Sequence, residues 1–318
     1  MHTSLLPTVS AIIPAFNAQQ FVGRAIESLL ATGYPKLQIV VVDDGSTDNT
    51  LECITHLAQA RADSVIVVRQ HPDGANRGVS ASRNLGISTS SGELICFLDA
   101  DDTVEPHRFE NATRILSESP EVDGVYEMAS VVVEHPTQAT SWKDQQTFGI
   151  QDPLQHTELL KTLIQGTPWP SSGILFRRTL LDQTGCFHES FSIAEDCHLW
   201  MRMAAVGHVV PGNLEHHVST YHRQTGSLYT PSIDRKLDYF RALADFLRWT
   251  KHAALPATTK DVIRQEIGSW LDNTLIQCRE QSRGRLALAV VGTAARSMPG
   301  LAFTRRNLAN VLFTIMRK

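Results

Sequence analysis

Three aspartates lie close together in the segment GELICFLDADDTVE, which covers residues 92–105. Asp99, Asp101 and Asp102 follow a run of five apolar residues that predicts a buried strand. Mg²⁺ and Mn²⁺ prefer oxygen ligands, and Mg²⁺ usually takes one or two protein carboxylates together with phosphate oxygens. The cluster therefore predicts a divalent-cation site at the end of a strand. Capping of a following helix would explain Asp102, but it would not explain Asp99.

A second acidic group, Asp43-Asp44-Gly45-Ser46, follows the apolar run of residues 37–42. A tight turn leading into a capped helix would account for Gly45 and Ser46. That explanation fits Asp43 poorly, because this carboxylate comes directly after a strand. We predict that it accepts the imide N–H of uracil or thymine, or the N–H groups of guanine.

The elements that must position these acids alternate along the first hundred residues. Apolar runs predict strands at 9–13, 37–42, 64–68 and 94–98, and helical spacing predicts helices at 18–31, 50–61 and 80–87. This βαβαβαβ order predicts an α/β fold with an open, mainly parallel sheet and helices on both faces. Ligands bind such sheets beyond the carboxyl ends of the strands. Polar or acidic clusters occupy three of those ends, at 14–17, 43–46 and 99–102.

The rest of the chain is less regular. We expect one or two strands within 122–133, a loop over 134–153 and a short strand at 172–176. Helical periodicity then predicts helices at 192–206, 235–250 and 258–281, followed by a helical tail from residue 283 with a break at Pro299-Gly300.

Bulk properties narrow the class of protein. The chain has 318 residues and a formal net charge of −4, which gives no polycation for nucleic acid. Its five cysteines form no CxxC pair, which favours a reducing compartment. The first residues lack a basic secretory signal, and the apolar stretch 286–295 is shorter than the about 20 residues that span a bilayer. We expect a cytoplasmic protein.

Positive charge concentrates at the C-terminus. Residues 283–318 contain no acid and seven basic residues, namely Arg283, Arg285, Arg296, Arg305, Arg306, Arg317 and Lys318. This pattern predicts peripheral contact with an anionic surface, such as the inner face of the cytoplasmic membrane. A solvated helical face, or a contact with the acidic remainder of the chain, would explain the same charges.

Four segments in order closely resemble the family 2 glycosyltransferases. They read VSAIIPAFNAQQFVGRAIESLL, IVVVDDGSTDNT, GVSASRNLGISTSSGELICFLDADD and GCFHESFSIAEDCHLWMR, and the resemblance extends over about residues 7–230. It implies a GT-A fold that transfers a sugar from a nucleotide-diphosphate sugar, usually with inversion, in bacterial cell-surface polysaccharide synthesis. The implied divisions are a nucleotide-sugar half (1–110), an acceptor half (111–230) and a C-terminal helical extension (231–318).

The resemblance also assigns roles to residues. Asp43 would contact the base, Asp99 the ribose and Asp101 a Mn²⁺ or Mg²⁺ ion on the diphosphate of a UDP-, dTDP- or GDP-sugar, with Asp102 in support. Arg77 or Arg83 would serve the nucleotide. The family's pattern implies that four consecutive residues line the nucleotide pocket, namely Pro14, Ala15, Phe16 and Asn17.

On the acceptor side, the family places a catalytic base in a Glu-Asp pair, here Glu195-Asp196, and we assign the base to Asp196. The alternative is a carboxylate held by the macrodipole at a helix start, paired with Arg202. Trp200 could stack on a sugar face or lie in the core, and the same holds for Trp169.

A histidine that often contacts the metal in this family would fall near residue 220. Gln224 occupies that position in one alignment, and His222 or His217 could replace it, which puts the third metal contact in doubt. The segment DFLRW at 245–249 is close to a motif of processive members, and we attribute it to chance.

These features predict a non-processive enzyme that acts on a glycan or lipid-linked glycan. An inactive nucleotide-sugar-binding scaffold protein is the main alternative. A nucleotidyltransferase is disfavoured, because residues 14–17 lack the Gly-rich loop with Arg and Lys that such enzymes need.

Overall fold

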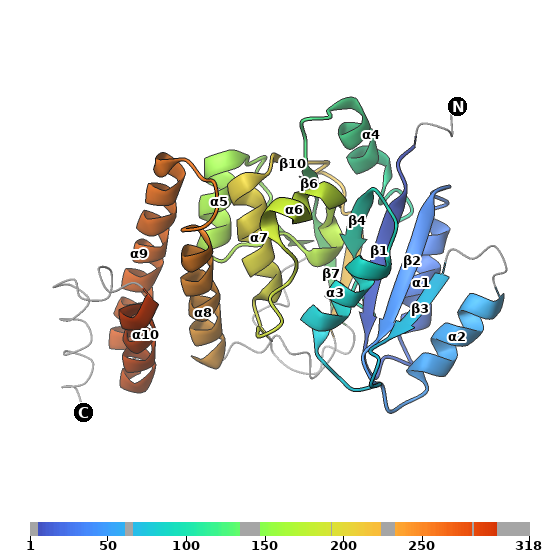
Figure 1. Cartoon of the computed structure of the whole chain (residues 1–318), viewed down its shortest axis with the longest axis horizontal. Coiled ribbons are helices and arrows are strands. Elements are labelled where there is room, and N and C mark those ends of the chain that lie inside the picture. Colours follow the sequence, from blue (N-terminus) through green and yellow to red (C-terminus); the bar gives the residue numbers. More distant parts are fainter. Residues whose placement is uncertain are drawn as a thin grey trace. The chain divides into compact units, whose positions relative to one another are not determined.

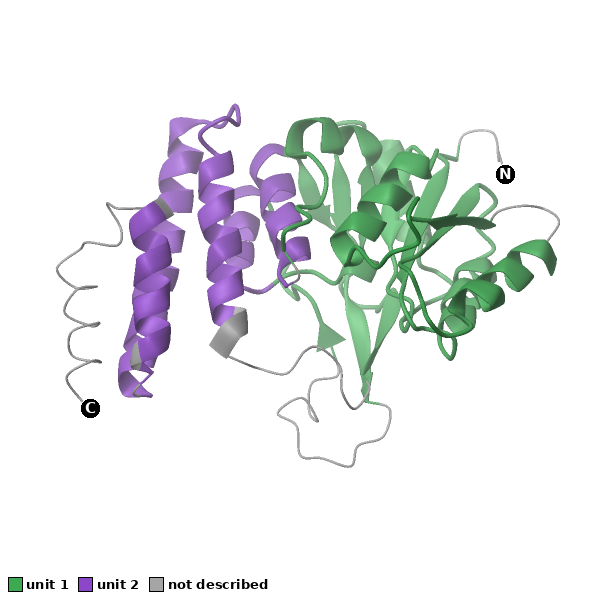
Figure 2. Ribbon diagram, turned by 60° about the horizontal axis from the view of Figure 1, so that its bottom comes forward, with its two compact units in different colours: residues 1–155, 168–192, 207–228 green, residues 156–167, 193–206, 229–318 purple. Residues whose placement is uncertain are grey.

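The computed structural model describes residues 6–60, 66–133, 147–191, 193–223, 233–281 and 283–297. The chain forms two compact units, coloured separately in Figure 2. The first contains residues 1–155, 168–192 and 207–228, and the second contains residues 156–167, 193–206 and 229–318. These boundaries differ from the expected divisions after residues 110 and 230, because two helices from the middle of the chain group with the C-terminal helices.

The first unit is built on a seven-stranded sheet with the strand order β10-β6-β9-β4-β1-β2-β3 (Figure 1). Strand β9 runs antiparallel to β4 and β6, whereas the other neighbouring pairs are parallel. The predicted mixed, mainly parallel sheet is thus confirmed. Its strands are β1 (Val9–Ala15), β2 (Leu37–Asp43), β3 (Ile66–Gln70), β4 (Leu94–Phe97), β6 (Gly124–Tyr126), β9 (Ile174–Arg177) and β10 (Val209–Pro211).

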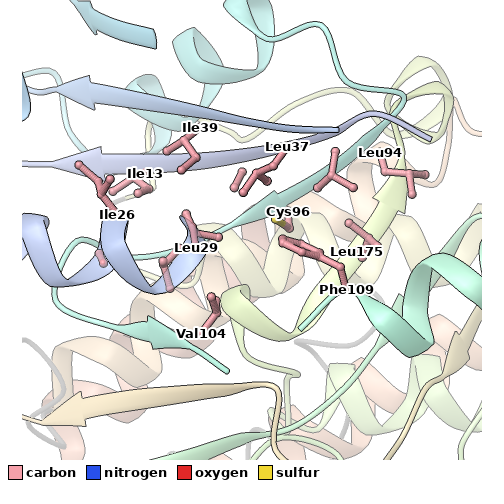
Figure 3. Packing of buried hydrophobic residues seen from close by; sticks show 14 of the residues in the cluster. Ile13, Ile26, Leu29, Leu37, Ile39, Leu94, Cys96, Val104, Phe109 and Leu175 are labelled. Atoms are coloured by element: carbon pink, nitrogen blue, oxygen red, sulfur yellow. The ribbon is translucent and has the colours of Figure 1, made fainter. Parts of the chain in front are cut away.

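Helices cover both faces of this sheet. Successive side chains of a strand point to opposite faces, and the apolar residues of β1 and β2 are buried on both. On one face, Ile13 of β1 and Ile39 of β2 share a core with Ile26 of α1 and Phe109, the residue before α4 (Figure 3). On the other face, a Cβ atom added to Gly86 would collide with the side chain of Ile12, so α3 packs directly on β1. The helices of this unit are α1 (Val22–Ala31), α2 (Thr50–Ala60), α3 (Val79–Thr89), α4 (Glu110–Glu118) and α6 (Leu181–Thr184), with short 3₁₀ helices at Ser171–Gly173 and Arg178–Leu180.

A smaller four-stranded sheet follows the acidic cluster, with the order β5-β11-β7-β8. Strand β5 begins directly after Asp102, and α4 starts only at Glu110. The expectation that Asp102 caps the next helix is therefore wrong. Strand β8 also lies within the segment expected to be loop. The strands are β5 (Thr103–Val104), β7 (Ala129–Val133), β8 (Thr147–Phe148) and β11 (Ser219–Arg223).

The second unit is helical. Its helix α5 packs on α7 and α9, and α8 packs on α7 and α10. The rings of Phe240 and Trp270 stack with centroids 5.5 Å apart, joining α8 to α9. None of the described helices has the length and apolar character needed to cross a membrane. The helices described in this unit are α5 (His156–Ile164), α7 (Glu195–Val206), α8 (Ile233–Trp249), α9 (Ala257–Glu280) and α10 (Gly284–Ser297).

Candidate active site

The three polar clusters lie at the carboxyl ends of neighbouring strands. Strand β1 pairs with β2 up to Ala15 opposite Asp43, and with β4 up to Ile12 opposite Phe97. The Asp44 backbone N–H continues the first pairing by donating to the Ala15 carbonyl at 2.8 Å. Residues 14–17, 43–46 and 99–102 therefore meet at one edge of the sheet, where α/β sheets bind ligands.

Asp43 carries a buried oxygen that lacks a partner. The residue is 1% exposed, and its Oδ2 accepts from Gln70 Nε2 at 2.9 Å and from the Ser46 backbone N–H at 3.4 Å. Within the described part of the chain, Oδ1 has no hydrogen-bond partner. A buried acceptor left unpaired costs about 1–3 kcal/mol. A ligand that donates an N–H to this oxygen would recover that free energy.

Asp44 holds the loop that precedes α3. Its two carboxylate oxygens accept from the backbone N–H groups of Arg77 and Gly78 at 2.8 and 2.9 Å. Nε2 of the buried His71 lies 3.3 Å from Asp44 Oδ1 and 3.0 Å from Ser82 Oγ. The sequence interpretation missed this role, for which the only signal was a second acid beside Asp43.

The loop after β1 is fastened to the loop after β2. Asn17 adopts a positive φ of 49°, donates its backbone N–H to Ser46 Oγ and accepts from the Thr47 backbone N–H at 2.9 Å. Its neighbour Phe16 leaves 49% of its surface exposed. A glycine is needed at position 45 because the backbone of another loop lies close to it. A Cβ atom there would lie 2.7 Å from the Asn76 backbone nitrogen. The backbone at this edge is therefore fixed, while one aromatic ring remains accessible.

The two candidate arginines have different environments. Arg83 is buried, and its Nη2 lies 2.7 Å from Asp99 Oδ1. Its guanidinium also lies over the rings of Phe97 and Phe187, at 6.0 and 5.3 Å from their centroids. Arg77 is half exposed and pairs with the equally exposed Asp73 at 2.8 Å. Arg83 thus orients Asp99, whereas the guanidinium of Arg77 faces solvent.

Asp102 links the acidic cluster to the small sheet. The buried carboxylate accepts from the His222 backbone N–H at 2.9 Å, and the His222 Nε2 lies 3.0 Å from Thr103 Oγ1. Burial, followed by the charges of Asp99 and Asp101, raises the pKa of Asp102 well above its usual range. The pairing of β5 with β11 therefore brings the predicted His222 next to the acidic cluster, where its backbone N–H contacts Asp102.

The carboxylates of this cluster would suit a divalent cation whose remaining ligands come from a diphosphate. No group of three His, Cys, Asp or Glu side chains among the described residues could hold a metal ion. The charges of Asp99 and Asp101 nevertheless repel the Asp102 carboxylate, and this repulsion adds to the larger effect of burial in raising the pKa of Asp102. A divalent cation would relieve this repulsion, and Mg²⁺ commonly takes only one or two protein carboxylates beside phosphate oxygens.

The Glu195-Asp196 pair forms the first turn of α7 in the helical unit. Asp196 is partly exposed and its Oδ1 accepts from the Cys197 backbone N–H at 2.6 Å, whereas Glu195 is only 9% exposed. A carboxylate at a helix N-terminus is stabilised by the macrodipole. Of the two acids, Asp196 is the more exposed.

Both candidate stacking residues are core residues. Trp200 and Trp169 are 0% exposed, and the indole of Trp169 stacks on Tyr126 with ring centroids 5.5 Å apart. A sugar cannot stack on a ring that is fully covered by protein. The prediction that Trp200 binds substrate is therefore contradicted by its burial.

The chain resembles known glycosyltransferases in sequence. The model of the family described as glycosyl transferase family 2 matches residues 10–185. An uncharacterized glycosyltransferase from Nostoc sp. is 32% identical over 179 residues, which cover 55% of this chain and 52% of the relative. A second relative, from Rickettsia typhi, is 27% identical over 239 residues and is covered to 70% of its length. The chain thus spans about half the length of the Nostoc relative.

Solved structures share the fold at low identity. The crystal structure of S. aureus TarS in complex with UDP-GlcNAc superposes with a TM-score of 0.67 at 19% identity, covering 98% of this chain and 91% of that one. A mannosyltransferase from Pyrobaculum calidifontis, in complex with GDP-Man and Mn²⁺, gives a TM-score of 0.58 at 17% identity, covering 98% and 85%. The predicted GT-A fold is confirmed by these neighbours.

Proposed function

Because the chain belongs to glycosyltransferase family 2, we propose that it transfers a sugar from a nucleotide-diphosphate sugar to the hydroxyl of an acceptor. The observation that carries this proposal is the buried Oδ1 of Asp43, which has no hydrogen-bond partner among the described residues. It lies at the same sheet edge as the carboxylates of Asp99 and Asp101. The UDP-GlcNAc and GDP-Man complexes of the structural neighbours support the same donor class.

Residues at the carboxyl edge of the sheet bind the sugar donor. Asp43 accepts an N–H of the base, and residues 14–17 line the nucleotide through their backbone. Asp99, oriented by Arg83, binds the ribose, and Asp101, with His222 nearby, holds Mn²⁺ or Mg²⁺ against the diphosphate. When bound, the cation offsets the negative charge that develops on the leaving diphosphate.

The transfer proceeds with inversion at the anomeric carbon. The acceptor oxygen forms its bond to that carbon as the bond from the carbon to the diphosphate oxygen breaks. The proton of the acceptor hydroxyl passes to the carboxylate of Asp196, which acts as general base. Glu195 binds the acceptor beside it.

The acceptor is a glycan or a lipid-linked glycan, and one sugar or few are added at a time. Basic residues near the C-terminus support peripheral contact with an anionic membrane surface. Arg283, Arg285 and Arg296 belong to this group, and its other members lie outside the described residues.

A measurement of donor turnover distinguishes an active glycosyltransferase from an inactive scaffold protein that only binds the donor. UDP-GlcNAc, GDP-Man and dTDP-glucose are incubated with the protein and Mn²⁺, and release of the nucleoside diphosphate is measured. We expect slow hydrolysis of one donor without an acceptor, because water can replace the acceptor hydroxyl. Tight binding of a donor without release of any nucleoside diphosphate would favour the scaffold.

Replacing Asp43 with Asn should weaken donor binding. A hydrogen bond to a charged acceptor contributes about 1.5–3 kcal/mol, so the dissociation constant of the preferred donor should rise about 10- to 100-fold. Calorimetric titration measures this change. The melting temperature of the ligand-free variant should not fall, because the substitution removes a buried, partly unpaired charge.

Asp48→Asn is the matched control, since the Asp48 carboxylate in the same loop accepts from the Thr50 and Gln19 backbone N–H groups. Its donor affinity should stay within about twofold of wild type. Equal affinities for Asp43→Asn and the control would contradict the assignment of Asp43 to the base.

A further inference from the structure

The first turn of α7 is connected to α8 through a buried histidine. His198 is 2% exposed, and its Nε2 lies 3.1 Å from Oδ2 of Asp245. The other oxygen of Asp245 lies 2.6 Å from Nη2 of Arg248, a mostly exposed residue of the same helix. The hydrogen bond from His198 and the one from Arg248 hold the pKa of Asp245 well below its usual range. Asp245 is thus an ionised carboxylate directed at α7.

The backbone that enters α7 is strained at one residue. Ala194 has a φ of 65°, in the left-handed region that a residue with a Cβ atom rarely adopts. Its carbonyl accepts the His198 backbone N–H at 3.0 Å. Such conformations persist only where the surrounding structure fixes them. His198 therefore closes the first turn through its backbone and connects that turn to α8 through its side chain.

Asp196 and His198 lie on different faces of α7. Residues two positions apart on a helix are separated by about 200° around its axis, so His198 and Asp196 do not face each other. The carboxylate of Asp245 is occupied by His198 and Arg248. We therefore expect Asp245 to act on Asp196 through His198 and the first turn of α7.

We propose that Asp245 is a positioning residue that fixes, through His198, the first turn of α7 and hence the direction of the Asp196 carboxylate. The inference rests on the proposed function only in taking Asp196 as the base. The His198–Asp245 contact and the strained Ala194 have complementary roles. The contact holds the first turn from α8, and Ala194 sets the direction in which the chain enters α7.

The test compares Asp245→Asn with Asp238→Asn. Asp238 pairs with Arg241 of α8 at 2.8 Å, with the same three-residue spacing by which Asp245 pairs with Arg248, but Asp238 has no ion pair to α7 among the described residues. Hydrogen exchange of peptides from residues 195–206 and 257–280 is followed without ligand. We expect exchange of the first turn of α7 to accelerate about tenfold in Asp245→Asn alone, with α9 unchanged.

Kinetics provide the second readout. For the best of UDP-GlcNAc, GDP-Man and dTDP-glucose with Mn²⁺, kcat of Asp245→Asn should fall about 10- to 100-fold while KM stays within about twofold. His198→Gln should give a similar loss, and combining it with Asp245→Asn should add little.

Three results would overturn the proposal. They are equal exchange in the two Asp variants, faster exchange across α9 as well as α7, and additive kinetic losses in the double variant. Failure of the wild-type protein to turn over any donor would refute the proposed function instead. The exchange measurement would then still decide whether Asp245 fixes the turn.

Discussion

Asp196→Asn is expected to lower kcat about 10²- to 10⁴-fold while the affinity for the donor stays unchanged. A general base contributes a factor of this size because it removes the acceptor proton as the new bond forms. Asn has nearly the same shape and can still accept the 2.6 Å hydrogen bond from the Cys197 backbone N–H. The first turn of α7 should therefore remain intact. Steady-state kinetics and calorimetric titration of the donor measure the two quantities separately.

Asp182→Asn serves as the control. Asp182 is also the second residue of its helix, α6, and is exposed. Its kcat should remain within about twofold of wild type. If Asp196→Asn kept wild-type turnover, or if it lost donor affinity together with turnover, Asp196 would not be the base.

A second large effect is expected in the core of the first unit, where Arg108 and Glu127 are almost completely buried. Their side chains meet at 3.3 Å, and Arg108 Nη2 also donates to the Ile174 carbonyl at 2.9 Å. The other carboxylate oxygen of Glu127 accepts from Asn111 Nδ2 and from the Asn213 backbone N–H. This network joins α4 to β6, β9 and the loop after β10.

Glu127→Ala should reduce the free energy of unfolding by about 3–5 kcal/mol. Removing one partner of a buried pair leaves the other charge without compensation in a low-dielectric interior. Urea denaturation followed by circular dichroism measures the loss. Glu118→Ala removes an exposed pair with Arg114 and should cost less than about 1 kcal/mol. Similar losses for the two variants would show that the buried network does not stabilise the unit.

The main elements of the sheet could be predicted from the sequence because their patterns are local. Strand β4 is a continuous apolar run, β1 and β2 are nearly so, and the helices that follow β1 and β2 have helical spacing. The three clusters at their ends follow from the rule that parallel strands end at one edge. The same reasoning could not place β5 and β8, which are two residues long and carry no periodic signal.

Residue roles were harder to predict because they depend on distant partners. Asp102 was expected to cap a helix, yet it accepts a hydrogen bond from His222, which is 120 positions away. Asp43 and Asp44 are adjacent residues of the same type. Within the described structure, Asp43 retains an oxygen without a hydrogen-bond partner, whereas Asp44 holds the loop before α3. Trp200 belongs to a residue type that both cores and sugar sites favour. Only the packing of α7 shows that it is buried.

Calorimetric titration of UDP, GDP and dTDP, with MnCl₂ and with EDTA, tests the central claim most directly. We predict that one nucleoside diphosphate binds wild-type protein at least about tenfold more tightly with Mn²⁺. Asp101→Asn should lose that metal-dependent gain and keep the metal-independent binding. The claim is contradicted if none of the three binds under either condition, or if Asp101→Asn retains the full effect of Mn²⁺.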